Sequence, residues 1–310
     1  MIRVFIDGAA GTTGLNIHRR ISQRKDLSLV VLDEARRKDP AARKDAILQS
    51  DVAFLCLPDD AAREAVALAG DANTVIIDTS TAHRVAPGWV YGFPELFGQR
   101  EKIAGAKRIA NPGCHASGFI ALAAPLVRSG LIEKDARLSC TSVTGYSGGG
   151  KKMIAAYEAP ENEERLRAPR LYALSQAHKH LPEMAKICGL ESAPVFCPIV
   201  SSYYAGMEVI VSLTAADVKG SLEDLKAVYR DAYPRGIVRF AEDADEEGFL
   251  SAGKYAGRDD MEIGIFGNEE RLTLVSRFDN LGKGACGAAI QNMNIALGLP
   301  EETGLVISED

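Results

Sequence analysis

The feature that most constrains the fold is a series of short apolar runs in the N-terminal third of the chain. They cover residues 1–6, 27–32, 52–57, 75–77 and 107–110. Polar or amphipathic stretches separate them. The runs are continuous rather than alternating, which predicts strands that are buried on both faces. Strands of this kind that alternate with helices form the parallel sheet of a doubly wound α/β fold.

A glycine-rich turn, GAAGTTG at residues 8–14, follows the first run. Gly8, Gly11 and Gly14 form a variant of the dinucleotide-binding fingerprint, in which glycine allows a tight turn and a close approach of backbone to pyrophosphate. The N–H groups that open the next helix would face the phosphates, and the hydroxyls of Thr12 and Thr13 can add donors. Any tight strand-to-helix turn can contain such glycines, so the position after the first strand is what favours a cofactor site.

The end of the second strand predicts which dinucleotide binds. It reads LDEARRK at residues 32–38. Asp33 alone would favour NAD, because a carboxylate can accept hydrogen bonds from ribose hydroxyls. Arg36 and Arg37 would suit the 2′-phosphate of NADP, because a guanidinium pairs bidentately with phosphate. A solvated charged loop is the alternative, and we predict NADP.

The pattern changes after residue 113. A helical stretch at 114–129 precedes β-rich segments at 136–144, 193–202 and 207–215, then a strand at 272–275 and a helix at 284–297. Ser221 and Asp224 have the spacing of a capping box, which predicts a further helix start.

A chain of 310 residues is too long for one small core and predicts two domains. We expect residues 1–113 and 284–310 to form a Rossmann-type domain that contains the parallel sheet. An α+β domain, residues 114–283, would be inserted between the Rossmann part and the terminal helix.

Composition and charge exclude some classes of function. The net charge is −6, which does not indicate the basic patch of a nucleic-acid-binding protein. Only six residues precede the charged Asp7, unlike a signal peptide, and no apolar run reaches the roughly 18 residues of a membrane helix. We therefore expect a soluble cytoplasmic protein that binds neither nucleic acid nor membrane.

Six cysteines are scattered along the chain, and none has the CxxC spacing of a zinc site. We expect no structural metal and, in a reducing compartment, no disulfide. All except Cys114 are expected to be buried as small apolar side chains.

Cys114 lies in the sequence NPGCH, residues 111–115, between a predicted strand and a predicted helix. The proline and glycine make a sharp turn, so the sulfur should lie at a helix N-terminus, where the dipole favours thiolate and backbone N–H groups can stabilise an oxyanion. A buried cysteine that merely follows a turn is the alternative. Neighbouring side chains diverge at a helix start, so His115 need not reach the sulfur and is expected to support the site. His18 and His83 are expected to be structural.

A second cluster is HKHLPE at residues 178–183. His178 and His180 could be metal ligands, but no third ligand has suitable spacing, and two exposed histidines are also possible. Alternate residues of an extended segment point the same way, which favours one general acid/base and one substrate contact. Pro182 biases Leu181 towards extended geometry and should make the chain rigid near His180. We predict His180 as the acid/base and His178 as a substrate or orienting contact.

A third cluster, TGYSGGGKK at residues 144–152, combines three consecutive glycines with two lysines. Close backbone approach and positive charge suit an anionic substrate, and a flexible hairpin is the alternative.

Together these segments resemble the N-acetyl-γ-glutamyl-phosphate reductases, in particular a short form of about this length, over essentially the whole chain. The resemblance is carried by GAAGTTG at 8–14, LPDDAAREA at 57–65, DTSTAHR at 78–84, YGFPEL at 91–96, NPGCH at 111–115, HKHLPE at 178–183 and DNLGKGACGAAIQNMN at 279–294. NPGC followed by HKHLPE is more specific than the glycine loop. The family shares a Rossmann domain, a dimerising α+β domain and a cysteine thioester mechanism with the aspartate-semialdehyde dehydrogenases.

The resemblance implies that NADPH reduces N-acetyl-γ-glutamyl phosphate to N-acetylglutamate 5-semialdehyde in arginine biosynthesis, with release of phosphate. Cys114 would be the nucleophile and His180 or His178 the acid/base, in a homo-oligomer that is a dimer or tetramer. The positions expected to contact the substrate are His178, Glu183, Ser147, Gly148, Lys151 and Arg84. Those expected to contact the cofactor are Gly8, Gly11, Thr12, Thr13, Gly14, Arg36, Arg37, Ser80 and Asn280. The family more often has Tyr-Pro-Thr after the cysteine, where this chain has His115, Ala116 and Ser117.

Three alternatives remain open. An aspartate-semialdehyde dehydrogenase would use the same chemistry, but its usual late Arg and His pair is not evident. A lysine-pathway reductase acting on a carrier-bound acyl phosphate would favour a basic surface, which the net charge of −6 does not encourage. A non-catalytic NADP-binding regulator would tolerate the loss of Cys114.

Overall fold

The chain divides into two compact units, which the computed structural model describes for residues 1–308 except 162 and 235. Unit 1 comprises Met1–Pro94, Gly98–Pro112 and Ala285–Leu305. Unit 2 comprises Glu95–Phe97, Gly113–Gly284 and Val306–Asp310. Unlike the domain division expected from the sequence, this one places Glu95–Phe97 and the chain from Val306 onward with the second unit. Within the described residues, none of the helices combines the length and the apolar character needed to cross a membrane.

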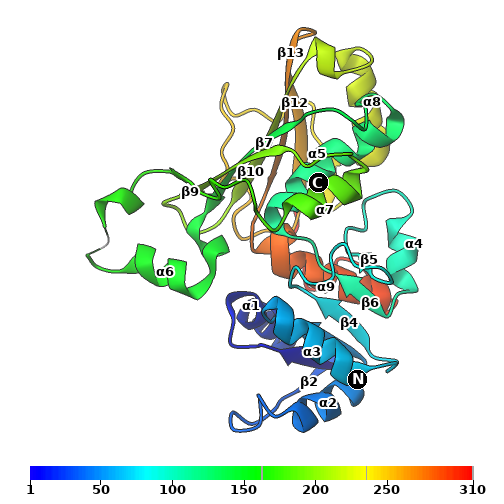
Figure 1. Ribbon diagram of the computed structural model, residues 1–310. Helices are drawn as coiled ribbons and strands as arrows, with labels where there is room; N and C mark the ends of the chain where they lie inside the picture. The colour runs from blue at the N-terminus through cyan, green and yellow to red at the C-terminus, as the bar shows by residue number, and fades with distance from the viewer. Residues whose placement is uncertain (162, 235, 309–310) are drawn as a thin grey trace. The chain divides into compact units, whose positions relative to one another are not determined.

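Unit 1 is built on a six-stranded sheet in the order β2-β1-β3-β4-β6-β5, with all its strand pairs parallel (Figure 1). The strands are β1 (Ile2–Asp7), β2 (Leu27–Val30), β3 (Val52–Leu55), β4 (Val75–Asp78), β5 (Val90–Tyr91) and β6 (Arg108–Ala110). The helices are α1 (Thr12–Ser22), α2 (Pro40–Leu48), α3 (Asp59–Ala69), α4 (Gln99–Ala104) and α9 (Gly287–Ala296). The predicted parallel sheet with interleaved helices is confirmed.

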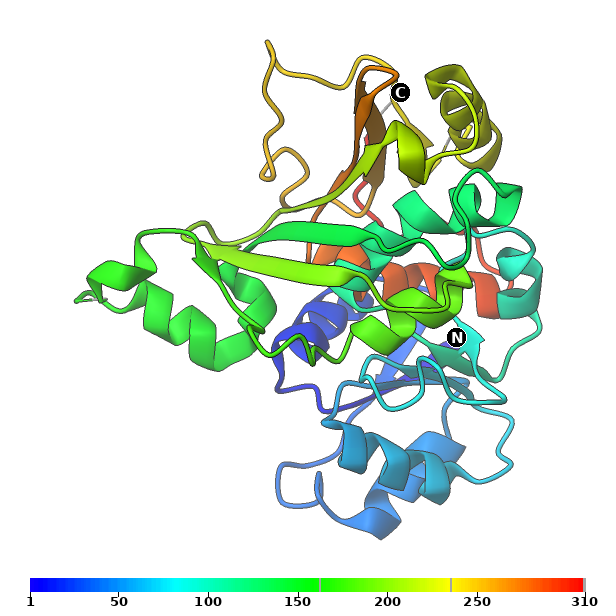
Figure 2. The same ribbon diagram turned by 45° about the horizontal axis from the view of Figure 1, so that its top comes forward.

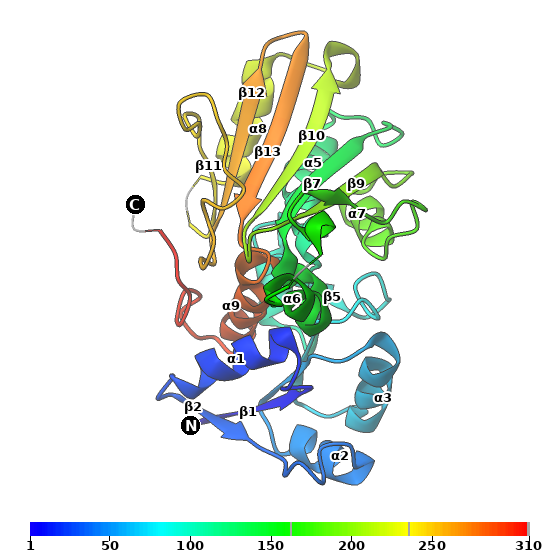
Figure 3. The same ribbon diagram turned by 90° about the vertical axis from the view of Figure 1, so that its left-hand side faces the viewer.

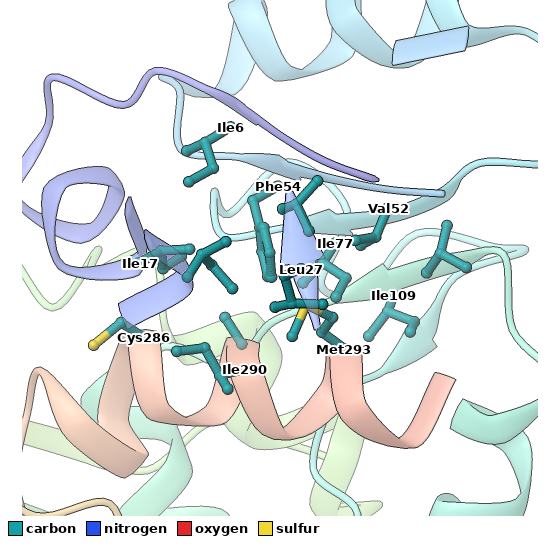
Figure 4. Close-up of a cluster of buried hydrophobic side chains, with 14 of the residues drawn as sticks. Ile6, Ile17, Leu27, Val52, Phe54, Ile77, Ile109, Cys286, Ile290 and Met293 are labelled. Atoms are coloured by element: carbon teal, nitrogen blue, oxygen red, sulfur yellow. The ribbon is translucent and has the colours of Figure 1, made fainter. Parts of the chain in front are cut away.

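Separate apolar clusters cover the two faces of this sheet. On one face, Phe54 and Ile77 pack with Ile17 of α1 and with Ile290 and Met293 of α9 (Figure 4). The cluster on the other face contains Phe5, Ala53, Leu55 and Ile76 with Ala46 and Ile47 of α2 and Ala65 and Ala69 of α3. Neighbouring positions on β3 therefore enter different cores, which is why its sequence is continuously apolar.

Unit 2 contains a mixed seven-stranded sheet in the order β11-β12-β13-β10-β7-β9-β8. The strands are β7 (Ser139–Gly145), β8 (Arg170–Leu171), β9 (Val195–Ser201), β10 (Met207–Thr214), β11 (Val238–Phe240), β12 (Met261–Gly267) and β13 (Arg271–Phe278). The helices are α5 (Cys114–Ser129), α6 (Gly150–Glu158), α7 (Leu181–Cys188) and α8 (Leu222–Ala232). The α+β class predicted for this part is confirmed.

Side chains of β7, β9 and β10 alternate between a buried, helix-covered face and a partly exposed, open face. Helices α5, α7 and α8 lie on one side of the sheet (Figure 3). On the covered face lie residues such as Cys140, Ser142 and Val209, which are fully buried. A Cβ at Gly118 of α5 would overlap the Val209 side chain, so glycine lets this helix approach the sheet closely. Helix α5 therefore lies directly against the centre of the sheet.

Helix α5 contains Pro125, which has no N–H to donate to the carbonyl of Ala121 one turn earlier. The hydroxyl of Tyr233, just beyond α8, donates to that carbonyl at 2.9 Å. Tyr229 of α8 donates to the neighbouring carbonyl of Leu122 at 2.6 Å. Both tyrosines are fully buried, so their hydroxyls satisfy backbone oxygens that water does not reach.

Several local expectations can be compared with the structure. Ser221 and Asp224 form the predicted capping box of α8, and the two hydrogen bonds from Ser221 lower the pKa of the Asp224 carboxyl. The glycine-rich segment at 144–152 is not a hairpin, because a 3-10 turn, Tyr146–Gly149, continues into α6. Helix α6 projects beyond the sheet of unit 2 (Figures 1 and 2).

Two further expectations were partly wrong. The helix expected from residue 284 begins as a π-helical turn, Gly282–Cys286, before the regular α9. Cys140, Cys188 and Cys286 are buried as predicted, whereas Cys56 and Cys197 are partly exposed. Cys197 lies on β9, beside Thr141 on the open face of the second sheet, which explains its exposure.

We predict that Tyr233→Phe lowers the free energy of unfolding by about 1–3 kcal/mol, because the buried Ala121 carbonyl loses its partner. Urea unfolding of the variant against the parent chain measures this. Pro125→Ala supplies a backbone N–H for the same carbonyl, so in that background Tyr233→Phe should cost clearly less. An equal cost in both backgrounds would show that the proline does not create the need for the tyrosine.

Candidate functional site

Cys114 is the first residue of α5, and its neighbour Gly113 is the N-cap, with extended backbone and no side-chain cap. The residue is partly exposed. The residue therefore lies at the end of the helix where backbone N–H groups have no partner within the helix, and the positive end of a 16-residue helix favours its thiolate form. The prediction that Cys114 lies at a helix start is confirmed.

Glu183, in the first turn of α7, fixes the turn that carries Cys114. Its Oε1 accepts a hydrogen bond from the Gly113 N–H at 2.8 Å, and the residue is only 1% exposed. This bond joins the NPGC and HKHLPE segments, which are far apart in the sequence. The role of Glu183 as a substrate contact stays a prediction, since the carboxylate is engaged with backbone here.

The two histidines of HKHLPE come together, although not by the expected geometry. His180 is the N-cap of α7 with right-handed helical backbone, and Leu181 begins the helix rather than being extended. The prediction of an extended segment was therefore wrong, because Pro182 is tolerated in the first helical turn. The rings of His178 and His180 nevertheless lie 4.7 Å apart, and the His180 N–H donates to Nδ1 of His178 at 3.2 Å.

Burial differs between the two rings. His180 is 5% exposed, whereas His178 is half-buried. Within the described part of the chain, no three His, Cys, Asp or Glu side chains are grouped as metal ligands would be.

His115 faces the same cluster from the start of α5. Its Nδ1 is 2.7 Å from Ser142 Oγ, and its Nε2 is 2.6 Å from the hydroxyl of Tyr172. The ring centroid lies 5.8 Å from that of His178 and 5.6 Å from that of His180. Burial, together with the neighbouring His178, lowers the pKa of His115 to about 3. His115 is therefore a neutral ring within the site.

Tyr172 is a site residue that the sequence reasoning missed. It follows the two-residue strand β8, and its backbone N–H donates to the carbonyl of Pro198 at 3.0 Å. Burial raises the pKa of its phenol, and the nearby Cys114 charge raises it further. Nothing in the local sequence separates Tyr172 from the other tyrosines, so only the fold brings it to His115, the neighbour of Cys114.

The DNLGKG segment also approaches Cys114. A Cβ on Gly284 would lie 2.9 Å from the Cβ of Cys114, so the backbone passes directly beside the cysteine. Asp279 fixes the segment by accepting N–H bonds from Gly257, Leu281 and Gly282. The close approach to Cys114 explains why a glycine is needed at position 284.

A buried ion pair fixes Lys283, which directly precedes Gly284. Lys283 Nζ lies 2.7 and 2.8 Å from the two carboxylate oxygens of Glu95, and the side chains are 1% and 7% exposed. The pair joins YGFPEL to DNLGKG, two segments that the resemblance had singled out without assigning either residue.

The expected substrate positions around α6 separate into buried and exposed ones. Ser147 is fully buried and accepts a hydrogen bond from Asn280 Nδ2 at 2.9 Å, and Asn280 Oδ1 accepts from the Gly206 N–H at 3.0 Å. Gly148 and Lys151 are exposed. Asn280 was expected at the cofactor, and both ends of its amide are engaged within unit 2. The roles of these residues stay predictions.

In the glycine turn of unit 1, the fold requires glycine at positions 8 and 14 but not at position 11. Gly8 has a φ of +86°, and a Cβ at Gly8 or Gly14 would overlap backbone of Cys56 or of the turn itself. A Cβ at Gly11 would meet only the Gly8 and Cys56 oxygens, at ordinary distances of 3.5 and 3.9 Å. The fold therefore does not require glycine at position 11, although a closely bound phosphate would.

Helix α1 begins directly after Gly11, which supplies no side-chain cap to its N–H groups. Among the described residues, no hydrogen-bond partner is found for the buried hydroxyl of Thr12. Open N–H groups and a spare hydroxyl at a helix N-terminus fit a dinucleotide pyrophosphate.

The charged residues after β2 are all exposed. Arg36 lies 3.9 Å from Asp39, and Arg37 lies 3.2 Å from Glu34, with both guanidinium groups more than half exposed. Ion pairs of this kind contribute little in water, so both arginines can turn towards a phosphate. Asp33 is exposed on the same turn.

The DTSTAHR segment follows β4 and is tied together internally. Asp78 accepts from the Ser80 hydroxyl at 2.8 Å and lies 2.6 Å from Nδ1 of His83, whose ring stacks on Trp89. Arg84 donates to the carbonyls of Asn111 and Thr79, at 3.0 and 3.1 Å. Contacts of Ser80 and Arg84 with cofactor or substrate stay predictions.

Comparison with known proteins places this site in a family. The family description "Semialdehyde dehydrogenase, NAD binding domain" matches residues 3–106, and "Semialdehyde dehydrogenase, dimerisation domain" matches residues 114–280. The chain is 46% identical to the N-acetyl-gamma-glutamyl-phosphate reductase of Brucella anthropi, with 96% of this chain and 98% of that protein covered. It is 42% identical to N-acetyl-gamma-glutamyl-phosphate reductase 2 of Nostoc sp., with 98% and 99% covered. The chain belongs to the N-acetyl-gamma-glutamyl-phosphate reductase family.

Solved structures agree on the fold. Aspartate semialdehyde dehydrogenase II from Vibrio cholerae superimposes with a TM-score of 0.73 at 18% identity, covering 96% of this chain and 99% of that one. Aspartate semialdehyde dehydrogenase from Candida albicans, solved with NADP, gives 0.66 at 16% identity, with the same coverage. The reductase family and these dehydrogenases therefore share one architecture.

The glycine turn of this reductase family member yields a matched test of the cofactor site. We predict that Gly11→Ala folds with nearly parental stability but weakens dinucleotide binding at least about tenfold, because the methyl group enters space that only a ligand would fill. Isothermal titration with NADP and a thermal melt measure the two quantities. Gly14→Ala is the control and should lose stability, since its Cβ would overlap backbone. Parental affinity in a folded Gly11→Ala would rule out close pyrophosphate contact at this position.

Proposed function

We propose that the chain reduces N-acetyl-γ-glutamyl phosphate to N-acetylglutamate 5-semialdehyde and phosphate, with NADPH as reductant. The observation that carries the proposal is a partly exposed cysteine at the start of α5, whose neighbour His115 lies against His178 and His180 just before α7. The printed names of the relatives, which are 42–46% identical over nearly their full length, support this substrate class. A cytoplasmic location stays a prediction.

Cys114 carries the first step. Its thiolate attacks the acyl carbon, a carbon–sulfur bond forms, and the carbon–oxygen bond to phosphate breaks with its electron pair leaving on phosphate. The N–H groups of the first turn of α5 are suited to stabilise the oxygen that becomes negative. Capture as a thioester replaces one difficult step by two easier ones.

A histidine supplies the proton that the second step requires. When the thioester is reduced, negative charge develops on the former acyl oxygen, which takes up the proton. The histidine takes the proton back when the hemithioacetal collapses to aldehyde and thiolate. We assign the acid/base role to His180, which α7 holds rigidly at its N-cap. His178 accepts the His180 N–H at Nδ1, so its proton lies on Nε2, from which it can orient the substrate.

The residues of unit 1 fit a nicotinamide dinucleotide, which when bound supplies the hydride for the reduction. The N–H groups after Gly11 and the Thr12 hydroxyl would hold the pyrophosphate. Arg36 and Arg37 would bind a 2′-phosphate, and this is the basis on which we assign NADP rather than NAD.

We further propose a homo-oligomer, assembled through the open face of the second sheet. Val143, Ile199 and Ile210 share that face with Thr141 and Cys197, as their cross-strand pairing requires, and all are partly exposed. Apolar side chains on an uncovered sheet face are typical of an interface, and the matched description names a dimerisation domain. Whether the assembly is a dimer or tetramer stays open.

The assignment of NADP predicts the effect of removing both arginines. Arg36→Ala with Arg37→Ala should weaken NADP binding by about 1–3 kcal/mol through lost charge-assisted hydrogen bonds and leave NAD binding nearly unchanged. Titration of both dinucleotides at one fixed salt concentration measures the difference. The same loss for NAD would mean that these arginines do not bind the 2′-phosphate.

The function is tested most directly by running the reaction backwards. With N-acetylglutamate 5-semialdehyde, phosphate and NADP, the parent chain should produce NADPH absorbance, and Cys114→Ser should lose at least about a hundredfold in turnover, because a serine hydroxyl is a weaker nucleophile. Binding of NADP to Cys114→Ser should be unchanged. Turnover within about tenfold of the parent would exclude the covalent mechanism.

Two comparisons complete this experiment. Aspartate semialdehyde replaces the acetylated substrate in a parallel assay, and a preference for it would favour the rival dehydrogenase.

His180→Asn should lower kcat by about 10²–10⁴, the usual range for a general acid/base, whereas His178→Asn should mainly raise KM. The reverse pattern would exchange the two histidine roles and leave the reaction class intact.

A further inference from the structure

We propose that Gln176 is a positioning residue for His178: its side-chain amide takes the place of a neighbouring strand beside Phe196 of β9, and so holds the loop from which the His178 ring reaches the site. This deepens the proposed function and rests on its assignment of His178 as a substrate contact. Gln176 acts through His178 and not on the substrate itself.

The edge of β9 is covered by main chain over only part of its length. The two residues of β8 pair with β9, and the N–H of Tyr172 donates to the Pro198 carbonyl at 3.0 Å. The chain then turns, and the Gln176 N–H donates to the Ala173 carbonyl at 3.0 Å. The paired main chain therefore ends at Pro198, two residues short of Phe196.

The side chain of Gln176 occupies the next place along this edge. Its Oε1 accepts from the Phe196 N–H at 2.8 Å, and its Nε2 donates to the Phe196 carbonyl at 2.7 Å. The partners fix the orientation of the amide, because a backbone N–H only donates and a carbonyl only accepts. Both bonds are partly buried, although Gln176 as a whole is exposed. We call these two bonds the amide clamp; they satisfy Phe196 as a neighbouring strand would.

Phe196 connects the amide clamp to the histidines. Phe196 is 1% exposed, and its ring lies edge-on to that of His178, with centroids 5.1 Å apart. The centroid of the His115 ring is 5.3 Å away from that of Phe196. His178 follows Gln176 by two residues, and its ring lies 4.7 Å from that of His180. The amide clamp therefore holds both the chain just before His178 and the residue against which its ring packs.

The loop between Tyr172 and His178 has a backbone that needs such support. Ala173 and Gln176 have φ values of 53° and 54°, in the left-handed region that residues with a side chain seldom adopt. Backbone of this kind persists where surrounding contacts over-determine it. Without the amide clamp the loop can relax, and His178, two residues further along, moves with it.

The amide clamp itself is tested with Gln176→Glu and Gln176→Leu. A protonated carboxyl group has a donor and an acceptor like the amide, whereas a carboxylate only accepts and faces the Phe196 carbonyl unpaired. This arrangement raises the pKa of the introduced carboxyl above its ordinary value near ~4.3. Gln176→Glu should therefore melt like the parent at low pH and lose stability, relative to the parent, as the pH rises through that pKa.

Thermal melts of the parent and both variants between about pH 4 and 8 measure this. Gln176→Leu lacks the amide clamp at every pH, so its loss should not depend on pH. The histidines and Tyr172 titrate in all three chains, so their contribution cancels in the difference from the parent. A Gln176→Glu variant whose difference from the parent is constant across this range would overturn the inference.

The positioning role is tested by kinetics at neutral pH. Gln176→Leu should raise KM about three- to tenfold, the effect of roughly one net hydrogen bond, with kcat within about twofold of the parent. Ser175→Ala, a change at the exposed neighbouring residue, should have parental kinetics. In a His178→Asn background Gln176→Leu should add nothing, because both changes remove the same contact. An undiminished effect in that background, or a parental KM in Gln176→Leu, would contradict a role through His178.

NMR of the imidazole carbons tests the same point without turnover. The chain has five histidines, so each ring can be assigned by substitution. Gln176→Leu should shift or broaden the His178 resonance and leave those of His18 and His83 in unit 1 unchanged. Should Gln176→Leu fail to fold, Gln176→Glu at low and at neutral pH gives the same comparison.

The two proposals can therefore fail separately. A parent chain without reductase activity, but with the expected melting and NMR patterns, would contradict the proposed function alone. An active reductase in which Gln176→Leu leaves both KM and the His178 resonance unchanged would contradict the inference alone.

Discussion

The packing of α5 against the centre of the second sheet is the constraint on which the site depends. Gly118 allows the close approach, since any larger residue would overlap Val209. Because the helix lies so close to β7, its first turn brings His115 within 2.7 Å of Ser142. The same first turn carries Cys114, so the position of this cysteine is set by sheet packing rather than by a surface loop. Sites built on packed elements are held more accurately than sites on loops.

The packing also explains how a helix with an internal proline stays at the centre of a unit. Pro125 removes a donor where no water can replace it, and two tyrosines at the end of α8 supply hydroxyls to the carbonyls of Ala121 and Leu122. A buried carbonyl without a partner would cost about 1–3 kcal/mol. Helix α8 therefore stabilises the same helix that carries Cys114 at its other end.

Much of the architecture could be predicted from the sequence, because its physical cause is local. Continuous apolar runs such as that of β3 report burial on both faces, and the Ser221–Asp224 spacing reports a helix start. The position of Cys114 at the start of α5 was predictable for the same reason, since a proline and a glycine directly precede it.

The remaining features depend on contacts between distant segments. Tyr172 reaches His115 only because β8 pairs with β9, and a two-residue strand leaves no periodicity in the sequence. The Glu95–Lys283 ion pair joins residues 188 positions apart, which no spacing rule connects. The extended geometry expected for Leu181 was wrong because Pro182 fits the first turn of a helix as well as it fits a strand end. Local rules describe both possibilities equally, and tertiary packing of α7 against α5 decides between them.

Three imidazoles share one cluster, and their burial divides their possible roles. His115 has both nitrogens occupied and a pKa near 3, so it changes no charge between about pH 5 and 9. Any pH dependence of the chemistry in that range must come from groups other than His115. His178 accepts a backbone N–H at Nδ1, and protonation of that nitrogen would break the bond. The hydrogen bond therefore fixes the orientation of the His178 ring beside His180, whose role as the acid/base stays a prediction.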